Sequence, residues 1–131
     1  MSASTLVQAS SVLVVDDDDL TQELLLEMLK DLGAKKVHIA HDGRKALKLL
    51  AGLQPLPQFL VCDIFMPEMD GFEFLEQLAA QHYSGGVVLM TGVDPEMLKL
   101  AGDIALANGL KVLGTFLKPV PMVQLTHALA A

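Results

Sequence analysis

The chain has 131 residues, enough for one domain with a buried core. Hydrophobic residues make up 52% of it and the mean hydropathy is +0.45, which excludes an intrinsically disordered chain. The net charge of −7 argues against a domain that binds nucleic acid. A secretory signal and an apolar run of the roughly 18 residues that span a membrane are both missing, so we expect a cytoplasmic protein without membrane contact. The single cysteine, Cys62, excludes an intrachain disulfide and a cysteine-based zinc site.

Short apolar runs alternate with amphipathic segments along the chain. The runs predict five strands, at residues 12–15, 36–40, 59–63, 87–91 and 111–117. Apolar residues at three- and four-residue spacing predict helices that begin near Leu20, Gly43, Phe72, Pro95 and Pro121. Residues 1–11 are small and polar and are expected to form a flexible leader before a domain over residues 12–131.

The sequence also predicts which of several side chains are buried and which lie on the surface. The first helix is expected to bury one stripe, formed by Leu20, Leu24, Leu25, Met28, Leu29 and Leu32. The third helix is expected to turn Phe72, Leu75 and Leu78 inward. His82 and His127 are expected on helix surfaces, and Cys62 is expected to be a small buried hydrophobe.

Alternating strands and helices indicate an α/β fold, a doubly wound five-stranded parallel sheet with helices on both faces. Polar residues end four of the strands: Asp16 and Asp17 after the first, Asp63 after the third, Thr91 after the fourth and Lys118 after the fifth. The carboxyl ends of parallel strands lie at one edge of the sheet, so we expect these residues to meet there.

The residue types at that edge predict a particular chemistry. Three neighbouring carboxylates repel one another unless a cation lies between them. Oxygen ligands without histidine or cysteine suit Mg²⁺. A lysine supplies positive charge for a phosphoryl group, a threonine hydroxyl supplies a hydrogen bond, and a carboxylate nucleophile can become an aspartyl phosphate. Together they predict a Mg²⁺-dependent phosphoryl acceptor.

At this point the sequence resembles the receiver domains of two-component response regulators, over Val12 to Ala131. The resemblance lies in five motifs: Val14-Val15-Asp16-Asp17-Asp18, Asp42-Gly43, Cys62-Asp63 with Met66-Pro67-Glu68-Met69-Asp70-Gly71, Met90-Thr91-Gly92, and Phe116-Leu117-Lys118-Pro119. It implies a flavodoxin-like (βα)5 fold with strand order 2-1-3-4-5.

The same resemblance implies roles for individual residues. Asp63 would accept the phosphoryl group, and Asp16, Asp17, Asp63 and the backbone carbonyl of Phe65 would bind Mg²⁺. The donor would be a phosphohistidine on a sensor histidine kinase or a phosphotransfer protein. The domain would catalyse its own phosphorylation and dephosphorylation. We also expect bulky Phe65, two residues after the acceptor, to shield the acyl phosphate from water.

Thr91 and Lys118 would hold phosphoryl oxygens in this scheme. Receivers usually carry an aromatic residue three positions before the lysine, which rotates inward when the threonine moves. Thr115 stands at that position here. The neighbouring Phe116 is expected to point to the other face of the strand, so the usual aromatic switch does not carry over to this sequence.

Two expectations concern partners. The segment between Thr91 and Lys118 is longer than in compact receivers and resembles receivers that are followed by an EAL-type cyclic-di-GMP phosphodiesterase domain. The face formed by the fourth helix, fifth strand and last helix is apolar enough to support a homodimer, although core packing explains its composition equally well.

Three other functions share parts of this pattern. A haloacid-dehalogenase-type phosphatase places its nucleophile after the first strand in an Asp-x-Asp-x-Thr/Val pattern, which fails at Leu20. A flavodoxin-like FMN binder needs a phosphate loop rich in Ser, Thr and Gly where this chain has Asp16 to Asp19. A receiver-like interaction module that is never phosphorylated shares the fold, but is disfavoured because all the expected site residues are present.

Overall fold

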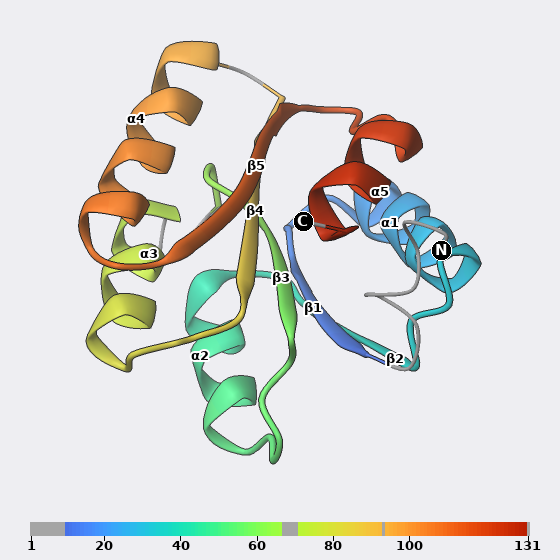
Figure 1. Ribbon diagram of the computed structural model, residues 1–131, viewed down its shortest axis with the longest axis horizontal. Helices are drawn as coiled ribbons and strands as arrows, with labels where there is room; N and C mark the ends of the chain where they lie inside the picture. Colours follow the sequence, from blue (N-terminus) through green and yellow to red (C-terminus); the bar gives the residue numbers. More distant parts are fainter. Residues whose placement is uncertain (1–9, 67–70, 93, 131) are drawn as a thin grey trace.

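The computed structural model describes residues 10–66, 71–92 and 94–130, in which strands and helices alternate (Figure 1). The elements are β1 (Ser11–Val15), α1 (Asp19–Asp31), β2 (Lys36–Ala40), α2 (Gly43–Ala51), β3 (Phe59–Asp63), α3 (Gly71–Ala80), β4 (Gly86–Thr91), α4 (Pro95–Ala107), β5 (Lys111–Leu117) and α5 (Met122–Ala130). The first nine residues of the expected leader and residues 67–70 of the motif after β3 lie outside the described residues. Ser10 is buried and Ser11 begins β1, so the fold starts slightly before residue 12.

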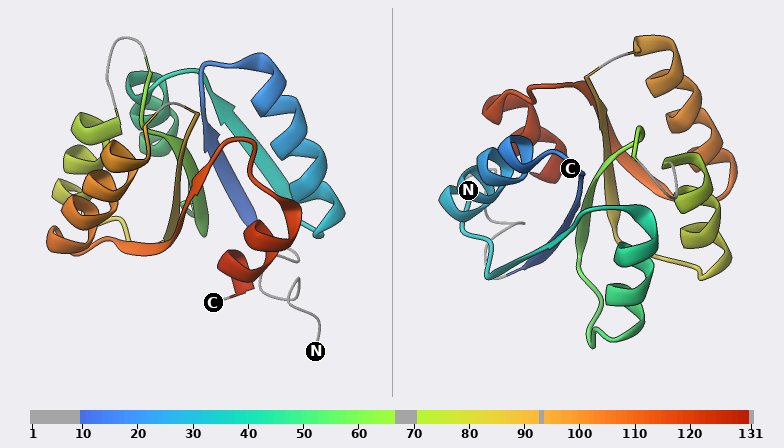
Figure 2. Two further views of the ribbon diagram at one scale, coloured as in Figure 1. Left: turned by 90° about the horizontal axis from the view of Figure 1, so that it is seen from above. Right: turned by 180° about the vertical axis from the view of Figure 1, so that it is seen from behind.

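The five strands form one parallel sheet in the order β2-β1-β3-β4-β5, which confirms the predicted fold class and strand order. Val15 pairs with Cys62 and Asp63 with Met90, so the carboxyl ends of β1, β3 and β4 come to one edge of the sheet. Figure 2 shows the sheet from two further sides, with the helices in two layers around it. None of the helices in the described ranges is long and apolar enough to cross a membrane.

Each face of the sheet has its own apolar core. Helices α2, α3 and α4 cover one face, and α1 and α5 cover the other (Figure 1). Side chains of β1 alternate between the two cores: Leu13 and Val15 face α2, α3 and α4, whereas Val12 and Val14 face α1 and α5. Burial on both faces explains why the central strands are continuous runs of apolar residues.

Aspartates begin three of the helices. Asp18 caps α1 by accepting hydrogen bonds from the N–H of Thr21 at 3.2 Å and from its hydroxyl at 2.6 Å. Asp42 and Asp94 cap α2 and α4 in the same way. The four consecutive acids therefore have two roles: Asp18 and Asp19 serve the start of α1, and Asp16 and Asp17 stay available to the sheet edge.

The structure corrects some expected positions. Leu20 and Leu24 are 73% and 41% exposed, because the first turn of α1 is rotated so that Gln22 takes the buried position. In α3, Phe74 is fully buried while Phe72 is half-buried. His82 lies in the turn after α3 at a φ of 57° and is not part of the helix.

Strand β5 contains a bulge that accommodates an extra residue. Val112 pairs with Val87 and Gly114 with Val88, so Leu113 is inserted between them. Phe116 packs in the core beneath α1 and α5, on the face away from α4, as expected. A Cβ on Gly114 would lie 2.7 Å from the Phe116 ring, so the glycine leaves room for it.

Candidate functional site

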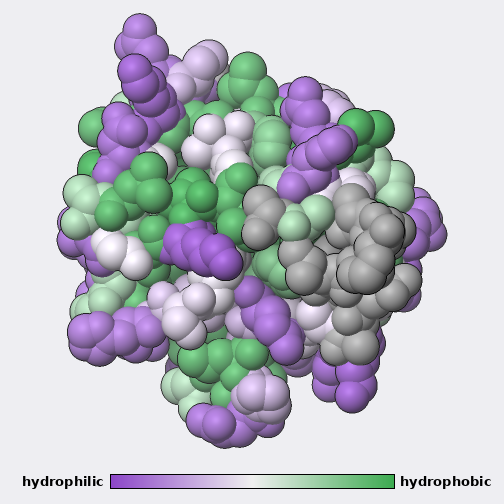
Figure 3. Space-filling model, viewed as in Figure 1, coloured by the Kyte–Doolittle hydropathy of each residue, from purple (hydrophilic) through white to green (hydrophobic). Residues whose placement is uncertain are grey.

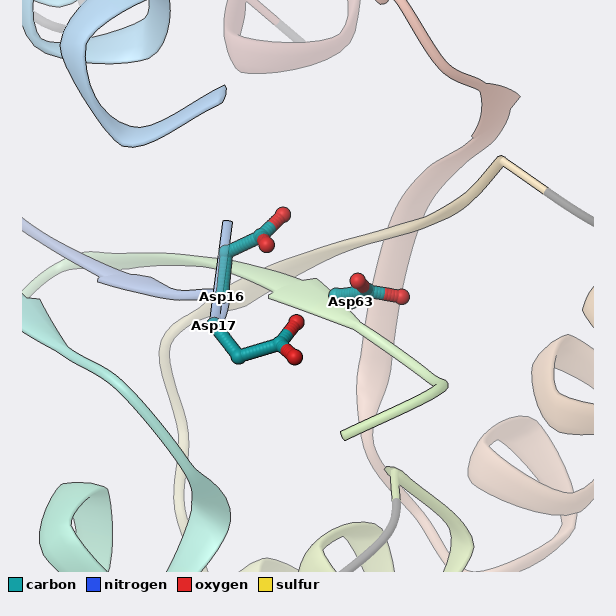
Figure 4. A group of neighbouring side chains, drawn as sticks. All are labelled: Asp16, Asp17 and Asp63. Atoms are coloured by element: carbon teal, nitrogen blue, oxygen red, sulfur yellow. The ribbon is translucent and has the colours of Figure 1, made fainter. Parts of the chain in front are cut away.

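The structure brings Asp16, Asp17 and Asp63 together at the carboxyl edge of the sheet. One carboxylate oxygen from each lies within 4.8 Å of those of the other two. Figure 4 shows the three side chains next to one another, two from the end of β1 and one from the end of β3. Asp16 is completely buried, Asp63 is 4% exposed and Asp17 is exposed to solvent. The cluster therefore has a buried floor and one open side.

Both oxygens of the Asp63 carboxylate have partners. Oδ1 accepts a hydrogen bond from the backbone N–H of Phe65 at 2.9 Å, and Oδ2 accepts one from Lys118 Nζ at 2.8 Å. The thiol of Cys62 is buried beside this carboxylate, and its burial, reinforced by the negative charge of Asp63, raises its pKa well above the usual value. The two hydrogen bonds hold the Asp63 carboxylate in one orientation. The raised pKa keeps the neighbouring Cys62 thiol neutral.

Lys118 connects the ends of β1, β3 and β4. Its Nζ lies 2.7 Å from Asp16 Oδ2 and 2.8 Å from Asp63 Oδ2, and its backbone N–H donates to the carbonyl of Thr91 at 2.8 Å. Burial alone would lower the pKa of Lys118, but its close contacts with the Asp16 and Asp63 carboxylates outweigh it and raise the pKa. The ammonium group therefore stays charged at neutral pH.

Asp16 is the most constrained of the three acids. Its Oδ1 accepts the backbone N–H of Asp18 at 2.8 Å, which folds the chain after β1 back toward the carboxylate. Its Oδ2 is buried and, apart from the ion pair with Lys118, has no hydrogen bond of good geometry among the described residues. Burial raises the pKa of Asp16 despite the opposing effect of Lys118, and the charge of Asp63 adds to the increase.

The charges in this cluster do not balance without a further cation. Three carboxylates and one ammonium leave two negative charges at the edge of the sheet. The cluster contains only oxygen donors, and the Oδ2 atom of Asp16 has an unused acceptor capacity. A divalent ion that prefers oxygen, such as Mg²⁺, fits this donor set and supplies the two missing positive charges.

Thr91 and Phe65 complete the group predicted from the sequence. Thr91 ends β4 and is completely buried, next to Lys118 in the backbone ladder. Phe65 lies two residues beyond β3 and is 39% exposed, so its ring lies at the surface beside the cluster. All six predicted site residues thus lie at one edge of the sheet.

Two features of this edge were not expected from the sequence. Gln22 is 7% exposed and donates to the backbone carbonyl of Asp16 at 2.5 Å, and the same amide nitrogen lies 3.0 Å from Nδ1 of His41. The only available signal was that Gln22 stands three residues before Leu25 and seven before Leu29, on the stripe of α1 that is otherwise apolar. Gly71 also has a specific role, because a Cβ there would overlap the Cα of Ile64, the residue after Asp63.

Comparisons with known proteins identify the family. The model of the response regulator receiver domain matches residues 12–130. The chain belongs to this family. It is 35% identical over 109 residues to the Regulator of RpoS of Escherichia coli K12, covering 83% of this chain and 30% of that protein. It is 52% identical over 64 residues to an uncharacterised 14.6 kDa protein of Leptolyngbya boryana, covering 49% of this chain and 47% of that protein.

A solved relative shows the same fold for this receiver domain. The crystal structure of a response regulator from Colwellia psychrerythraea is 32% identical, with a TM-score of 0.78, and the match covers 93% of this chain and 94% of that one. The chain spans less than half the length of these two curated relatives. As a receiver domain it is a phosphorylation-controlled signalling module, and neither the phosphatase nor the FMN-binding alternative gains support from the comparisons.

Proposed function

We propose that Asp63 is the residue of this receiver that accepts a phosphoryl group from a phosphohistidine. The observation that carries the proposal is the Asp63 carboxylate itself, 4% exposed at the end of β3, with Lys118 Nζ at 2.8 Å and two further aspartates beside it. A buried nucleophile with a fixed cation on one oxygen is arranged for in-line attack on a phosphorus atom.

The transfer step needs few groups. A carboxylate oxygen of Asp63 attacks phosphorus and a P–O bond forms, while the P–N bond breaks and leaves its electron pair on the nitrogen. A phosphohistidine that carries a proton on its other ring nitrogen then leaves as neutral imidazole. Lys118, whose ammonium contacts Oδ2 of Asp63, balances charge on the phosphoryl oxygens. Thr91 supplies a hydroxyl at the end of β4 for another phosphoryl oxygen. Because these groups are in place before the reaction, little reorganisation accompanies it.

The residues that would hold Mg²⁺ are Asp16, Asp17, Asp63 and the backbone carbonyl of Phe65. The ion would neutralise negative charge on the acceptor and on the phosphoryl oxygens. Asp16 and Asp63 are fixed by hydrogen bonds from the backbone N–H groups of Asp18 and Phe65. Asp17 is exposed and gives the site its open side, through which the phosphoryl donor would enter.

The partners follow from this chemistry. A sensor histidine kinase or a phosphotransfer protein would supply the phosphohistidine, in the cytoplasm where the kinase meets ATP. Figure 3 shows hydrophobic surface over α4 and β5. Leu106 near the end of α4 and Leu117 at the end of β5 are 58% and 49% exposed. This surface supports a homodimer through α4, β5 and α5. An EAL-type output domain stays a prediction from the sequence.

Intact mass measurement tests the acceptor. The protein is incubated with Mg²⁺ and acetyl phosphate, and the expected product carries one phosphoryl group that hydroxylamine removes, as it does from acyl phosphates. Asp63→Asn should give no adduct. Asp103→Asn, a change at an exposed acid of α4, is the matched control and should be phosphorylated normally.

Other outcomes identify the alternatives. Sustained hydrolysis of many phosphate esters would favour the phosphatase. A protein that binds its partners but never acquires a phosphoryl group would favour the non-phosphorylated interaction module. Sedimentation of the phosphorylated and unphosphorylated forms separately tests the homodimer, which should form more readily after phosphorylation.

A further inference from the structure

Gln22 of α1 connects Asp16, at the end of β1, to His41, which follows β2. It lies in the first part of α1 and is 7% exposed, although its side chain is polar. Its amide nitrogen donates to the backbone carbonyl of Asp16 at 2.5 Å and lies 3.0 Å from Nδ1 of His41, which follows β2. One side chain thus joins the end of β1, the start of α1 and the turn between β2 and α2.

The orientation of this amide follows from its partners. A backbone carbonyl can only accept a hydrogen bond, so the Gln22 atom that faces Asp16 must be the NH₂ nitrogen. With one hydrogen used there, the second is available to His41, whose Nδ1 must accept it and whose Nε2 then carries the ring proton. Both hydrogens of the buried amide therefore have partners.

The backbone N–H and the backbone carbonyl of Asp16 are therefore both hydrogen-bonded. Its N–H donates to the carbonyl of Ala40 in β2 at 3.1 Å, and its carbonyl accepts from Gln22. The carbonyl belongs to the peptide that joins Asp16 to Asp17. Asp17 is exposed, so packing does not fix its side chain, and the direction of this peptide sets where the backbone that carries the side chain lies.

We propose that Gln22 is a positioning residue for the Mg²⁺ site: it fixes the Asp16–Asp17 peptide and so the backbone that carries the Asp17 side chain. His41 supports it by accepting the second amide hydrogen. The role rests on the proposed function, because it presumes that the three aspartates hold the ion. Groups that orient metal ligands in this way commonly change metal affinity by about 10- to 100-fold when they are replaced.

Calorimetric titration of the protein with MgCl₂ tests the role. Gln22→Met and Gln22→Leu remove both amide hydrogens, and we expect the dissociation constant for Mg²⁺ to rise by about tenfold. Gln77→Met makes the same chemical change at an exposed position of α3 and should leave the constant unchanged. His41→Phe, at an exposed position, should weaken Mg²⁺ binding by a smaller factor. Melting curves in EDTA show separately whether each variant is folded.

Phosphorylation by acetyl phosphate over a range of Mg²⁺ concentrations gives a second readout. The Gln22 variants should need more Mg²⁺ for half of the maximal rate but should reach the wild-type rate at saturation, which a general loss of structure would not produce. Wild-type Mg²⁺ affinity in both Gln22 variants, or in His41→Phe, overturns the proposal. A wild-type protein that binds Mg²⁺ without becoming phosphorylated overturns the function of Asp63 and leaves the result for Gln22 to be judged on affinity alone.

Discussion

Replacing Lys118 with methionine should destabilise the metal-free domain in a pH-dependent way. Lys118 Nζ lies 2.7 Å from Asp16 and 2.8 Å from Asp63, and its side chain is only 16% exposed. At an effective dielectric constant of about 20, each contact contributes about 6 kcal/mol of Coulomb attraction, much of which offsets the cost of burying the charges. Methionine keeps the aliphatic volume of the side chain and removes only this charge.

When the lysine charge is lost, the change that requires the least free energy is protonation of Asp16. The free energy of this protonation sets how much Lys118→Met is destabilised. The ordinary pKa of this carboxyl, 3.8, lies about three pH units below pH 7. Protonating such a group at pH 7 therefore costs about 4 kcal/mol. Burial already raises the pKa of Asp16 in the wild-type protein, so part of this cost is present there. We therefore expect the free energy of unfolding to fall by about 2–4 kcal/mol at pH 7.

The pH dependence identifies the cause. A carboxyl whose folded-state pKa is raised stabilises the fold at low pH, and this contribution is lost as the pH rises from the unfolded value through the folded one. The raised pKa of Lys118 itself stabilises the wild-type protein below the usual 10.5, and the contribution is lost as the pH rises through the folded value. Asp16 and Asp63 cause this rise only while they are ionised, so protonation of Asp16 at low pH weakens the contribution of Lys118. The difference between Lys118→Met and wild type should therefore be larger at pH 7 than at pH 4.

Thermal melting in EDTA at both pH values measures this difference. For a domain of this size the expected loss at pH 7 corresponds to a fall of about 6–12 °C in the melting temperature. Lys48→Met, at an exposed position of α2, is the matched control and should melt close to wild type. An equal loss at pH 4 and pH 7, or no loss at pH 7, would refute the account of Lys118 as the charge that balances Asp16 and Asp63.

Three further predictions concern the loop after β3 and the metal. Phe65→Asn should release phosphate from Asp63 several-fold faster than wild type, because water then reaches the acyl phosphate; an unchanged rate in a ³¹P NMR time course would argue against shielding. Gly71→Ala should lower the free energy of unfolding by about 1–3 kcal/mol or more in urea denaturation, since its Cβ would overlap the backbone of Ile64; a wild-type midpoint would contradict this. The rise in melting temperature on adding Mg²⁺ should grow from pH 4 to pH 7 as Asp16 ionises, and a gain that does not depend on pH would place the ion elsewhere.

The sheet and its functional edge were predictable because their signals are local and strong. Strand β3 is a buried apolar run that ends on Asp63, and β1 is a similar run that ends at Val15 and is followed by Asp16. Once the strands are parallel, topology alone brings such residues to one edge. The sequence also predicted that Phe116 does not replace the aromatic residue that receivers usually carry at the position of Thr115. Side chains alternate along a strand, and this alternation places Phe116 in the core beneath α1 and α5.

The remaining features depend on how elements pack. The spacing of leucines in α1 suggested that Leu20 is buried, but the rotation of the first turn places Gln22 inward instead. The contact between Gln22 and His41 joins residues 19 positions apart and leaves no pattern in the sequence. The bulge at Leu113 also depends on pairing with β4, so periodicity within β5 does not reveal it.

The central claim is that the phosphoryl group resides on Asp63, and residue mapping tests it most directly. The protein is phosphorylated by acetyl phosphate with Mg²⁺, treated with borohydride to reduce the acyl phosphate to an alcohol, and digested for peptide mass spectrometry. We predict homoserine at position 63 and unmodified aspartate at positions 16 and 17. Reduction at Asp16 or Asp17 in place of Asp63, or a stable phosphoryl group on a histidine or serine, would contradict the account.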